Sequence, residues 1–273
     1  MVDTPILKVE NLSISFGKNE IIHAISYVLK KNEILGIVGE SGSGKSVSSL
    51  AILGLLPKKI SKINFGSIIY NETNLVTLKP KSFQKIREIR KLRKDIQIIF
   101  QDPYSSLNPR IPVGEAIMEP MIVHKLYNTD KERKEKVIDI LTRVGLSEAY
   151  FNRYPHEFSG GQRQRIGIAR TIALQPKLIV CDESVSALDI SVQAQVLNLL
   201  NELKDTFGFT YIFISHDLAV VKFMSDQLLV MNQGKIEELD DADVIYNEPK
   251  KEYTKKLIEA IPKGLSIKTS KLH

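Results

Sequence analysis

Hydrophobic residues along the chain recur in patterns that predict alternating strands and helices. Apolar and polar residues alternate over Leu7–Val9 and Leu12–Phe16, which predicts a strand, and Gly17–Asn19 predicts the turn that follows it. The short, continuous apolar run Ile34–Val38 predicts a buried strand. The stretch Ser46–Leu56 predicts an apolar helix. We expect this helix to end there, because the next residue is a proline, which cannot continue a helix.

The second half of the chain predicts one long helical region between further strands. Val137, Ile140, Leu141 and Val144 share one helical face within the region Pro112–Ala173. The pattern therefore predicts an α/β core over residues 1–100 and 176–235, a helical insert over 101–175 and a C-terminal extension over 236–273. The remaining apolar runs predict strands at Ile63–Tyr70, Ile96–Phe100, Leu178–Cys181 and Thr210–Ile214.

Composition indicates a soluble globular protein. The chain has 273 residues, of which 43% are hydrophobic, and no uncharged apolar run approaches the ~20 residues that span a bilayer. The N-terminal residues show no secretion signal. The single cysteine, Cys181, excludes an internal disulfide and fits a reducing compartment, so we interpret it as a packing residue of its strand. If the protein serves a membrane, we expect it to do so from the cytoplasmic face through a partner.

A basic run lies between Lys79 and Asp95, with eight Lys or Arg residues against two acids in a chain of net charge +6. Such a run could bind nucleic acid or anionic headgroups. Ile86, Ile89 and Leu92 recur at helical spacing, however, and no aromatic residues interleave with the charges as base stacking would require. We therefore interpret the run as a solvated surface helix and predict no nucleic-acid partner.

The glycine-rich segment after the predicted strand Ile34–Val38 fits the phosphate-loop pattern G-x-x-x-x-G-K-[ST]. Glycines let the backbone curl so that its N–H groups face phosphates, and the following helix N-terminus adds positive potential. We expect Lys45 to reach the β- and γ-phosphates of ATP and Ser46 to bind Mg²⁺. The expected nucleotide contacts here are Gly39, Glu40, Ser41, Gly42, Ser43, Gly44, Lys45, Ser46 and Val47.

A second chemical feature is an apolar strand that ends in two carboxylates. Asp182 and Glu183 directly follow Leu178–Cys181. In proteins with a phosphate loop, this is the position where a carboxylate holds Mg²⁺, so Asp182 takes that role. Glu183 then stands where it could orient and polarise the attacking water.

The third motif is Phe158, Ser159, Gly160, Gly161 and Gln162, directly before a helical pattern. It resembles the signature sequence of ATP-binding-cassette (ABC) ATPases, usually Leu-Ser-Gly-Gly-Gln, with phenylalanine in place of leucine. A serine hydroxyl, two glycines and a helix start form a second site suited to a γ-phosphate. One chain does not need two such sites for one nucleotide. The resemblance implies a head-to-tail pair in which each ATP lies between one phosphate loop and the other subunit's signature.

Other positions match the family in order, and their roles are those that the resemblance implies. Gln101 matches the glutamine that contacts Mg²⁺ and the attacking water. The segment Ser186–Asp189 matches the loop that touches the opposite subunit, so Asp189 counts among the nucleotide-binding residues. His216 matches the histidine that senses the γ-phosphate. Phe16 falls where the family places an aromatic ring on adenine, although a core phenylalanine would look the same.

The resemblance narrows to one subfamily. Three segments are similar to those of the dipeptide, oligopeptide and nickel importer ATPases: Val38–Ser46, Gln101–Arg110 and Asp182–Asp189. These systems have two types of ATPase, and Gln101–Arg110 is similar to the form found in the second type. This implies a P-loop NTPase core with a RecA-like mixed sheet, an antiparallel β part and an inserted helical subdomain. Near the C-terminus, Pro249–Thr254 resembles the subfamily's Pro-x-His-Pro-Tyr-Thr element, with Lys251 and Glu252 in place of its His-Pro.

The function that the resemblance implies is ATP hydrolysis with Mg²⁺ that powers the import of peptides. The implied partners are a related ATPase in a heterodimer (or a second copy in a homodimer), two transmembrane permeases and an extracytoplasmic binding protein, at the cytoplasmic face of the membrane. Nickel or a metal chelate is an alternative cargo. An exporter subunit fits the subfamily motifs less well. A soluble ABC protein that acts on ribosomes or DNA is disfavoured, because the chain has neither a second cassette nor a long coiled coil.

Overall fold

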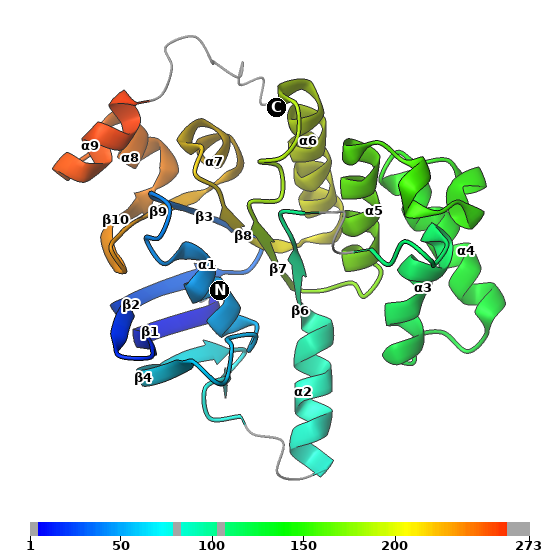
Figure 1. Cartoon of the computed structure of the whole chain (residues 1–273), viewed down its shortest axis with the longest axis horizontal. Helices are drawn as coiled ribbons and strands as arrows, with labels where there is room; N and C mark the ends of the chain where they lie inside the picture. The colour runs from blue at the N-terminus through cyan, green and yellow to red at the C-terminus, as the bar shows by residue number, and fades with distance from the viewer. Residues whose placement is uncertain (1–4, 79–82, 103–106, 261–273) are drawn as a thin grey trace. The chain divides into compact units, whose positions relative to one another are not determined.

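The computed structural model describes residues 5–78, 83–102 and 107–260. Its contacts divide the chain into two compact units. The first contains residues 1–79 and 210–273, and the second contains residues 80–209. Each unit is a structure in its own right, with its own strands and helices (Figure 1).

The first unit contains an antiparallel sheet with strand order β2-β1-β4-β5. The apolar residues Leu7, Val9, Leu12 and Ile14 of β1 are buried, as the sequence pattern predicts. Burial does not alternate strictly, because Ile6 and Ser13 beside them are buried as well. Phe16 of β1 pairs with Asn19 of β2, so two residues make the hairpin turn, and Gly17 adopts a left-handed conformation there. The strands are β1 (Pro5–Phe16), β2 (Asn19–Lys30), β4 (Ser61–Tyr70) and β5 (Thr73–Asn74).

The same unit contains strands of a mixed sheet in the order β10-β9-β3-β8. β3 is parallel to β8 and β9, and β10 is antiparallel to β9. Every residue of β3 and β8 is buried, which explains their continuous apolar sequences. The strands are β3 (Ile34–Val38), β8 (Thr210–Ile214), β9 (Gln227–Asn232) and β10 (Lys235–Asp241).

Among its described residues, the helices of this unit are α1 (Lys45–Ile52), α7 (Leu218–Met224), α8 (Ala242–Asn247) and α9 (Glu252–Glu259). The prediction that the first helix runs to Leu56 is wrong. Gly54 takes a left-handed conformation, its N–H donates to the carbonyl of Ala51, and the N–H of Leu55 donates to the carbonyl of Leu50. This Schellman motif ends α1 before the proline is reached.

The second unit contains the parallel strands β6 (Ile96–Ile99) and β7 (Leu178–Asp182), with Ile99 opposite Cys181. Its helices are α2 (Phe83–Asp95), α3 (Val113–Val123), α4 (Asp130–Arg143), α5 (Gly160–Ile172) and α6 (Ile190–Phe207). Two short 3₁₀ turns, Glu148–Asn152 and Pro155–Glu157, precede α5. The predicted helical region is therefore three helices with irregular connections.

The predicted apolar face of α4 is confirmed. Val137, Ile140 and Leu141 of α4 are buried, and so is Val144 just beyond its end. The basic run forms the exposed helix α2, as interpreted from its sequence; Lys79 and Lys81 lie outside the described residues. Among the residues that the structure describes, no helix is both long and apolar enough to cross a bilayer.

The α/β fold class is confirmed, with a mixed sheet, a separate antiparallel sheet and helices. The finer division into a core over 1–100 and 176–235, a helical insert over 101–175 and an extension over 236–273 stays a prediction.

A glycine pair tests how the second unit packs. Gly114 lies in α3, and a Cβ atom there would come within 2.3 Å of the Phe151 ring. Gly167 lies in α5, where a Cβ would meet no described atom within 4 Å. We expect Gly114→Ala to lower the free energy of unfolding by about 1–3 kcal/mol through overpacking. Gly167→Ala should raise it by about 0.5–1 kcal/mol, because alanine restricts the unfolded chain.

Differential scanning calorimetry of both variants measures the effect. Opposite shifts of the melting temperature support the packing described here. A Gly114→Ala protein as stable as the Gly167→Ala protein contradicts it.

Candidate nucleotide-binding site

The segment between β3 and α1 forms a tight loop that requires glycine. Gly39, Gly42 and Gly44 all have positive φ angles, of 151°, 82° and 100°. A Cβ on Gly39 would lie 2.1 Å from the carbonyl oxygen of Met231 in β9. The first glycine is therefore fixed by the close approach of β9 as well as by its own backbone conformation.

Lys45 is the central charged group of this loop and is only 6% exposed. Its Nζ donates hydrogen bonds of 2.8 Å to the carbonyls of Gly39 and of Glu40. A buried ammonium needs such partners, because burial without them is costly. In this structure Lys45 satisfies its ammonium by hydrogen bonds to the backbone of its own loop.

The loop also has the features that a bound phosphate chain requires. Within the described residues, the buried hydroxyl of Ser43 has no hydrogen-bond partner, and no side chain caps the start of α1 at Gly44. The first N–H groups of a helix lack intrahelical acceptors and carry partial positive charge. A phosphate chain would supply acceptors for these donors and a counter-charge for Lys45, so the geometry fits a nucleoside triphosphate.

The turn between β9 and β10 supports the loop from outside. The N–H of Gly234 donates to the carbonyl of Ser43 (3.0 Å), and its carbonyl accepts from the N–H of His23 in β2 (2.9 Å). A Cβ on Gly234 would lie 2.1 Å from the carbonyl oxygen of Ile21. The sequence patterns gave no indication of this support.

The other two predicted residues of the first unit lie at strand ends. His216 is exposed and lies two residues after the end of β8. The next residue is Asp217, whose carboxylate caps α7 by accepting from the N–H of Ala219 (2.9 Å). Phe16 is the half-buried last residue of β1. γ-Phosphate sensing by His216 and adenine stacking by Phe16 stay predictions.

In the second unit, Asp182 and Glu183 stand at the end of β7, and both are half-buried. Glu183 has a positive φ of 49°, a conformation that non-glycine residues seldom adopt. Such backbone strain occurs often at functional sites, where the surrounding structure holds it. Cys181 is fully buried, and burial raises the pKa of its thiol, which agrees with its interpretation as a packing residue.

Gln101 reaches the segment that follows Glu183. Its side-chain N–H donates to the hydroxyl of Ser186 at 3.4 Å, and that hydroxyl donates to the Glu183 carbonyl at 2.9 Å. Gln101 is thus linked through Ser186 to Glu183, the residue directly after β7. Its contact with Mg²⁺ and the attacking water stays a prediction. Residues 103–106 of the motif after Gln101 lie outside the described residues.

The segment that resembles the ABC signature is a capped helix start. The hydroxyl of Ser159 accepts from the N–H of Gln162 (3.3 Å), and the Gln162 side chain accepts from the N–H of Ser159 (3.0 Å), which is a capping box. A Cβ on Gly161 would lie 2.3 Å from Val192 in α6. Phe158 is buried edge-on against Tyr150, so its replacement of leucine changes the core.

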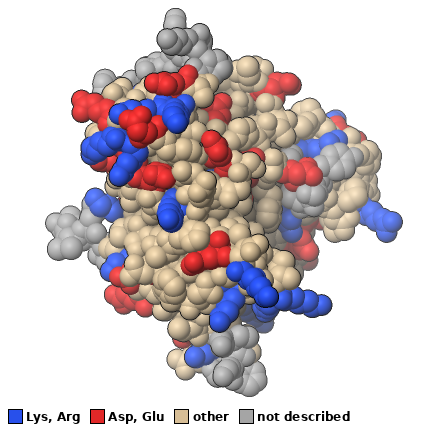
Figure 2. All heavy atoms as spheres, turned by 60° about the vertical axis from the view of Figure 1, so that its left-hand side comes forward, with Lys and Arg blue, Asp and Glu red and all other residues tan. Residues whose placement is uncertain are grey.

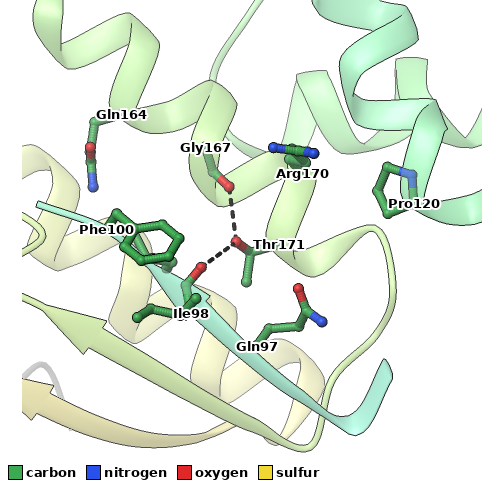
Figure 3. Close-up of a pocket in the computed structure, with 9 residues that line it drawn as sticks. Gln97, Ile98, Phe100, Pro120, Gln164, Gly167, Arg170 and Thr171 are labelled. Atoms are coloured by element: carbon green, nitrogen blue, oxygen red, sulfur yellow. Dashed lines mark hydrogen bonds between the residues drawn. The ribbon is translucent and has the colours of Figure 1, made fainter. Parts of the chain in front are cut away.

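A cavity of about 250 Å³ lies in the second unit, lined by Phe100 and by residues from β6, α3 and α5 (Figure 3). The hydroxyl of Thr171 lies 3.0 Å from the Gly167 carbonyl and 3.5 Å from the Ile98 carbonyl, and so joins α5 to β6. The side chain of Phe100 is 45% exposed at this place. The described residues contain no group of three or more His, Cys, Asp or Glu side chains that could hold a metal ion.

The residues from 22 to 186, more than half of the chain, match the family model for the ABC transporter. The chain belongs to the ABC transporter family. The resemblance stated from the sequence is confirmed.

The relatives include proteins named as transport ATP-binding proteins. The chain is 46% identical to the oligopeptide transport ATP-binding protein OppF of Bacillus subtilis, over 90% of this chain and 77% of that protein. It is 48% identical to OppF of Escherichia coli, over 88% and 69%. It is 42% identical to the dipeptide transport ATP-binding protein DppF of Lactococcus lactis, over 94% and 81%.

Two solved structures share the fold. One is cbiO1 from Clostridium perfringens, part of the ABC transporter complex cbiONQ, with a TM-score of 0.76, 27% identity and coverage of 94% of this chain and 96% of that one. The other is the dimeric ATP-binding cassette MJ0796 in a post-hydrolysis state with ADP and phosphate, with a TM-score of 0.72, 27% identity and coverage of 86% and 98%.

The side-chain cap at the start of α5 should contribute to the stability of the protein. Ser159→Ala should lower the free energy of unfolding by about 0.5–2 kcal/mol, because the N–H of Gln162 loses its acceptor. Ser159→Asp should keep the stability of the natural protein, because aspartate is an equally good cap and its charge suits a helix N-terminus.

Calorimetric melting temperatures of the two variants decide the point. If Ser159→Ala melts at the same temperature as the natural protein, the hydroxyl does not hold the helix start.

Proposed function

We propose that this chain is the ATP-hydrolysing subunit of an importer that takes up dipeptides or oligopeptides. The observation that carries the proposal is one chain with two phosphate-binding features, the loop around Lys45 and the capped start of α5 at Ser159. The cargo follows from relatives 42–48% identical to the chain, whose names state dipeptide or oligopeptide transport.

The proposed reaction is in-line attack of water on the γ-phosphorus of ATP. Lys45 already has its ammonium inside the loop and exchanges its two backbone carbonyls for phosphate oxygens when ATP binds. It then stabilises the charge that develops on the transferred phosphoryl group. Glu183 accepts a proton from the water and Gln101 and His216 position that water, because each is a polar group able to hydrogen-bond it.

The residues proposed for Mg²⁺ fit that ion. Mg²⁺ prefers hard oxygen ligands and is usually held by one or two carboxylates together with substrate phosphates. The hydroxyl of Ser46, the amide oxygen of Gln101 and the carboxylate of Asp182 are such ligands. Bound Mg²⁺ would neutralise charge on the phosphates of ATP.

The proposal includes a pair of ATPase subunits. The start of α5 offers Ser159, Gly160, Gly161 and Gln162 to the γ-phosphate held by the partner's phosphate loop, with Asp189 close to the same contact. The similar cassette MJ0796 is dimeric. The resemblance to the second of two ATPase types favours a related ATPase as the partner over a second copy of this chain.

Two permease subunits and an extracytoplasmic binding protein complete the proposed assembly at the cytoplasmic face of the cell membrane. The cavity of the second unit is a candidate place for a permease segment, because the exposed ring of Phe100 is part of its lining. Gln101, the residue after Phe100, is linked through Ser186 to Glu183. It would connect permease contact to the state of the nucleotide.

Replacement of Glu183 by glutamine tests the chemistry. The variant keeps the size of the side chain but cannot accept a proton from water, so we expect kcat for ATP hydrolysis to fall at least about 100-fold. ATP binding should remain within about twofold, and the ATP-bound pair should persist. The matched control is Glu202→Gln, an exposed residue of α6, which should change neither quantity.

Phosphate release and equilibrium binding of ATP measure these effects on the purified chain with its partner ATPase. Full turnover by the Glu183→Gln protein would remove Glu183 from the mechanism.

Uptake by cells separates peptide from nickel as cargo. A strain that lacks this chain should lose uptake of a radiolabelled oligopeptide and keep uptake of radioactive nickel. The natural gene should restore peptide uptake, and the Glu183→Gln variant should not. Loss of nickel uptake with normal peptide uptake would assign the alternative cargo.

A further inference from the structure

The C-terminal helix α9 contacts the phosphate loop directly. The hydroxyl of Tyr253 accepts a hydrogen bond from the backbone N–H of Glu40, with 3.1 Å between nitrogen and oxygen, although the two residues are 213 positions apart. Tyr253 is half-buried, and both residues belong to the first unit. Glu40 is the second residue of the phosphate loop, so this bond reaches the loop where it leaves β3.

The start of α9 is fixed to the sheet that supports the loop. The carboxylate of Glu238 in β10 is only 8% exposed and accepts from the backbone N–H groups of Lys250 (2.9 Å) and Lys251 (3.3 Å). Burial alone would raise the pKa of Glu238, but these bonds outweigh it and lower the pKa, so the carboxylate stays charged at neutral pH. Thr254, the residue after Tyr253, is fully buried.

This arrangement places the loop between two elements of the C-terminal part of the chain. β10 pairs with β9, and the Met231 carbonyl of β9 lies against Gly39, where it excludes a side chain. Tyr253 contacts the next residue, Glu40, from α9. The strands β9 and β10 therefore fix both the position of Gly39 and the start of α9.

Surface ion pairs do not account for this placement. Figure 2 shows acidic and basic side chains interspersed on the face that carries the C-terminal helices, and Lys250–Asp240 (3.1 Å) and Lys255–Glu252 (2.7 Å) are ion pairs there. Exposed pairs of this kind contribute little to stability. The buried Glu238 and the Tyr253 hydroxyl are the more specific contacts.

The tyrosine is suited to this role over the whole neutral range of pH. Burial raises the pKa of Tyr253 above its ordinary value of 10, so the phenol remains uncharged and its oxygen can accept from an N–H. In this structure Lys45 holds the carbonyls of Gly39 and Glu40 while Tyr253 holds the N–H of Glu40. Once Lys45 turns to phosphate oxygens, Tyr253 still holds the loop backbone.

We propose that Tyr253 is a positioning residue for ATP binding, whose hydroxyl fixes the start of the phosphate loop and makes the C-terminal helix part of the nucleotide-binding apparatus. The inference rests on the proposed function in taking ATP as the ligand. Tyr253 acts through the backbone of Glu40 and needs no contact with the nucleotide.

The test is Tyr253→Phe, which removes the hydroxyl and keeps the ring. The dissociation constant for N-methylanthraniloyl-ATP, measured by fluorescence in EDTA so that no turnover occurs, should rise about two- to tenfold, as the loss of one hydrogen bond implies. Hydrogen exchange of the Glu40 amide in the nucleotide-free protein should accelerate. The KM for ATP should rise while kcat at saturating ATP stays unchanged.

Tyr246→Phe is the matched control, because Tyr246 lies in α8, where its ring faces the ammonium of Lys222 at 3.6 Å. This variant should bind the fluorescent nucleotide as the natural protein does. Tyr253→Phe should remain folded and lower the melting temperature by no more than the loss of one hydrogen bond implies. Equal binding and equal Glu40 exchange in the Tyr253→Phe and natural proteins overturn the inference alone. Equal losses in both variants also overturn it. A natural protein that fails to bind the nucleotide with Mg²⁺ as well as in EDTA overturns the proposed function and the inference with it.

Discussion

The Lys45 ammonium is almost completely buried in the phosphate loop, and a buried charge has to be compensated by nearby dipoles. In this structure the carbonyls of Gly39 and Glu40 compensate it, which requires the backbone to curl back over the lysine. That curl depends on glycines with positive φ angles and on the close support of β9. The same geometry leaves the Ser43 hydroxyl and the start of α1 ready for an anion, so the burial of one charge prepares the site for a ligand of opposite charge.

The start of α5 shows how a motif can have a structural and a chemical role at once. Ser159 and Gln162 cap the helix through each other, and Gly161 allows α6 to approach. These constraints alone would favour serine, glycine and glutamine at these positions. The proposed contact with a partner's ATP uses the same residues, so a loss of activity in their variants has to be separated from a loss of helix capping.

Much of the fold could be predicted from local sequence patterns. Continuous apolar runs predicted β3, β7 and β8, because buried parallel strands need apolar residues on both faces. The predicted end of α1 was wrong, because Gly54 in a left-handed conformation ends the helix earlier. An apolar pattern alone does not indicate where such a C-cap lies. The strands β2, β9 and β10 were not predicted, and with them the support that Gly234 gives to the loop was missed.

The candidate site was predictable as far as motifs carry it. The loop around Lys45 and the strand end at Asp182 and Glu183 follow from spacing, because one local segment supplies all the chemistry. Two features of the site could not be predicted: the positive φ of Glu183 and the contact of Tyr253 with Glu40. Neither backbone strain nor a contact across 213 positions leaves a local sequence pattern. The sequence placed Tyr253 in a C-terminal element that resembles one of the subfamily, but gave it no role.

The most direct test of the central claim is to identify what accompanies this chain in the cell. The chain would be tagged, native membranes would be solubilised gently, and co-purifying proteins would be identified by mass spectrometry. The account predicts two permeases, a related ATPase and a binding protein whose bound ligand is a peptide. Recovery of soluble partners alone, such as ribosomal proteins, would leave the ATPase chemistry standing and contradict the role in import.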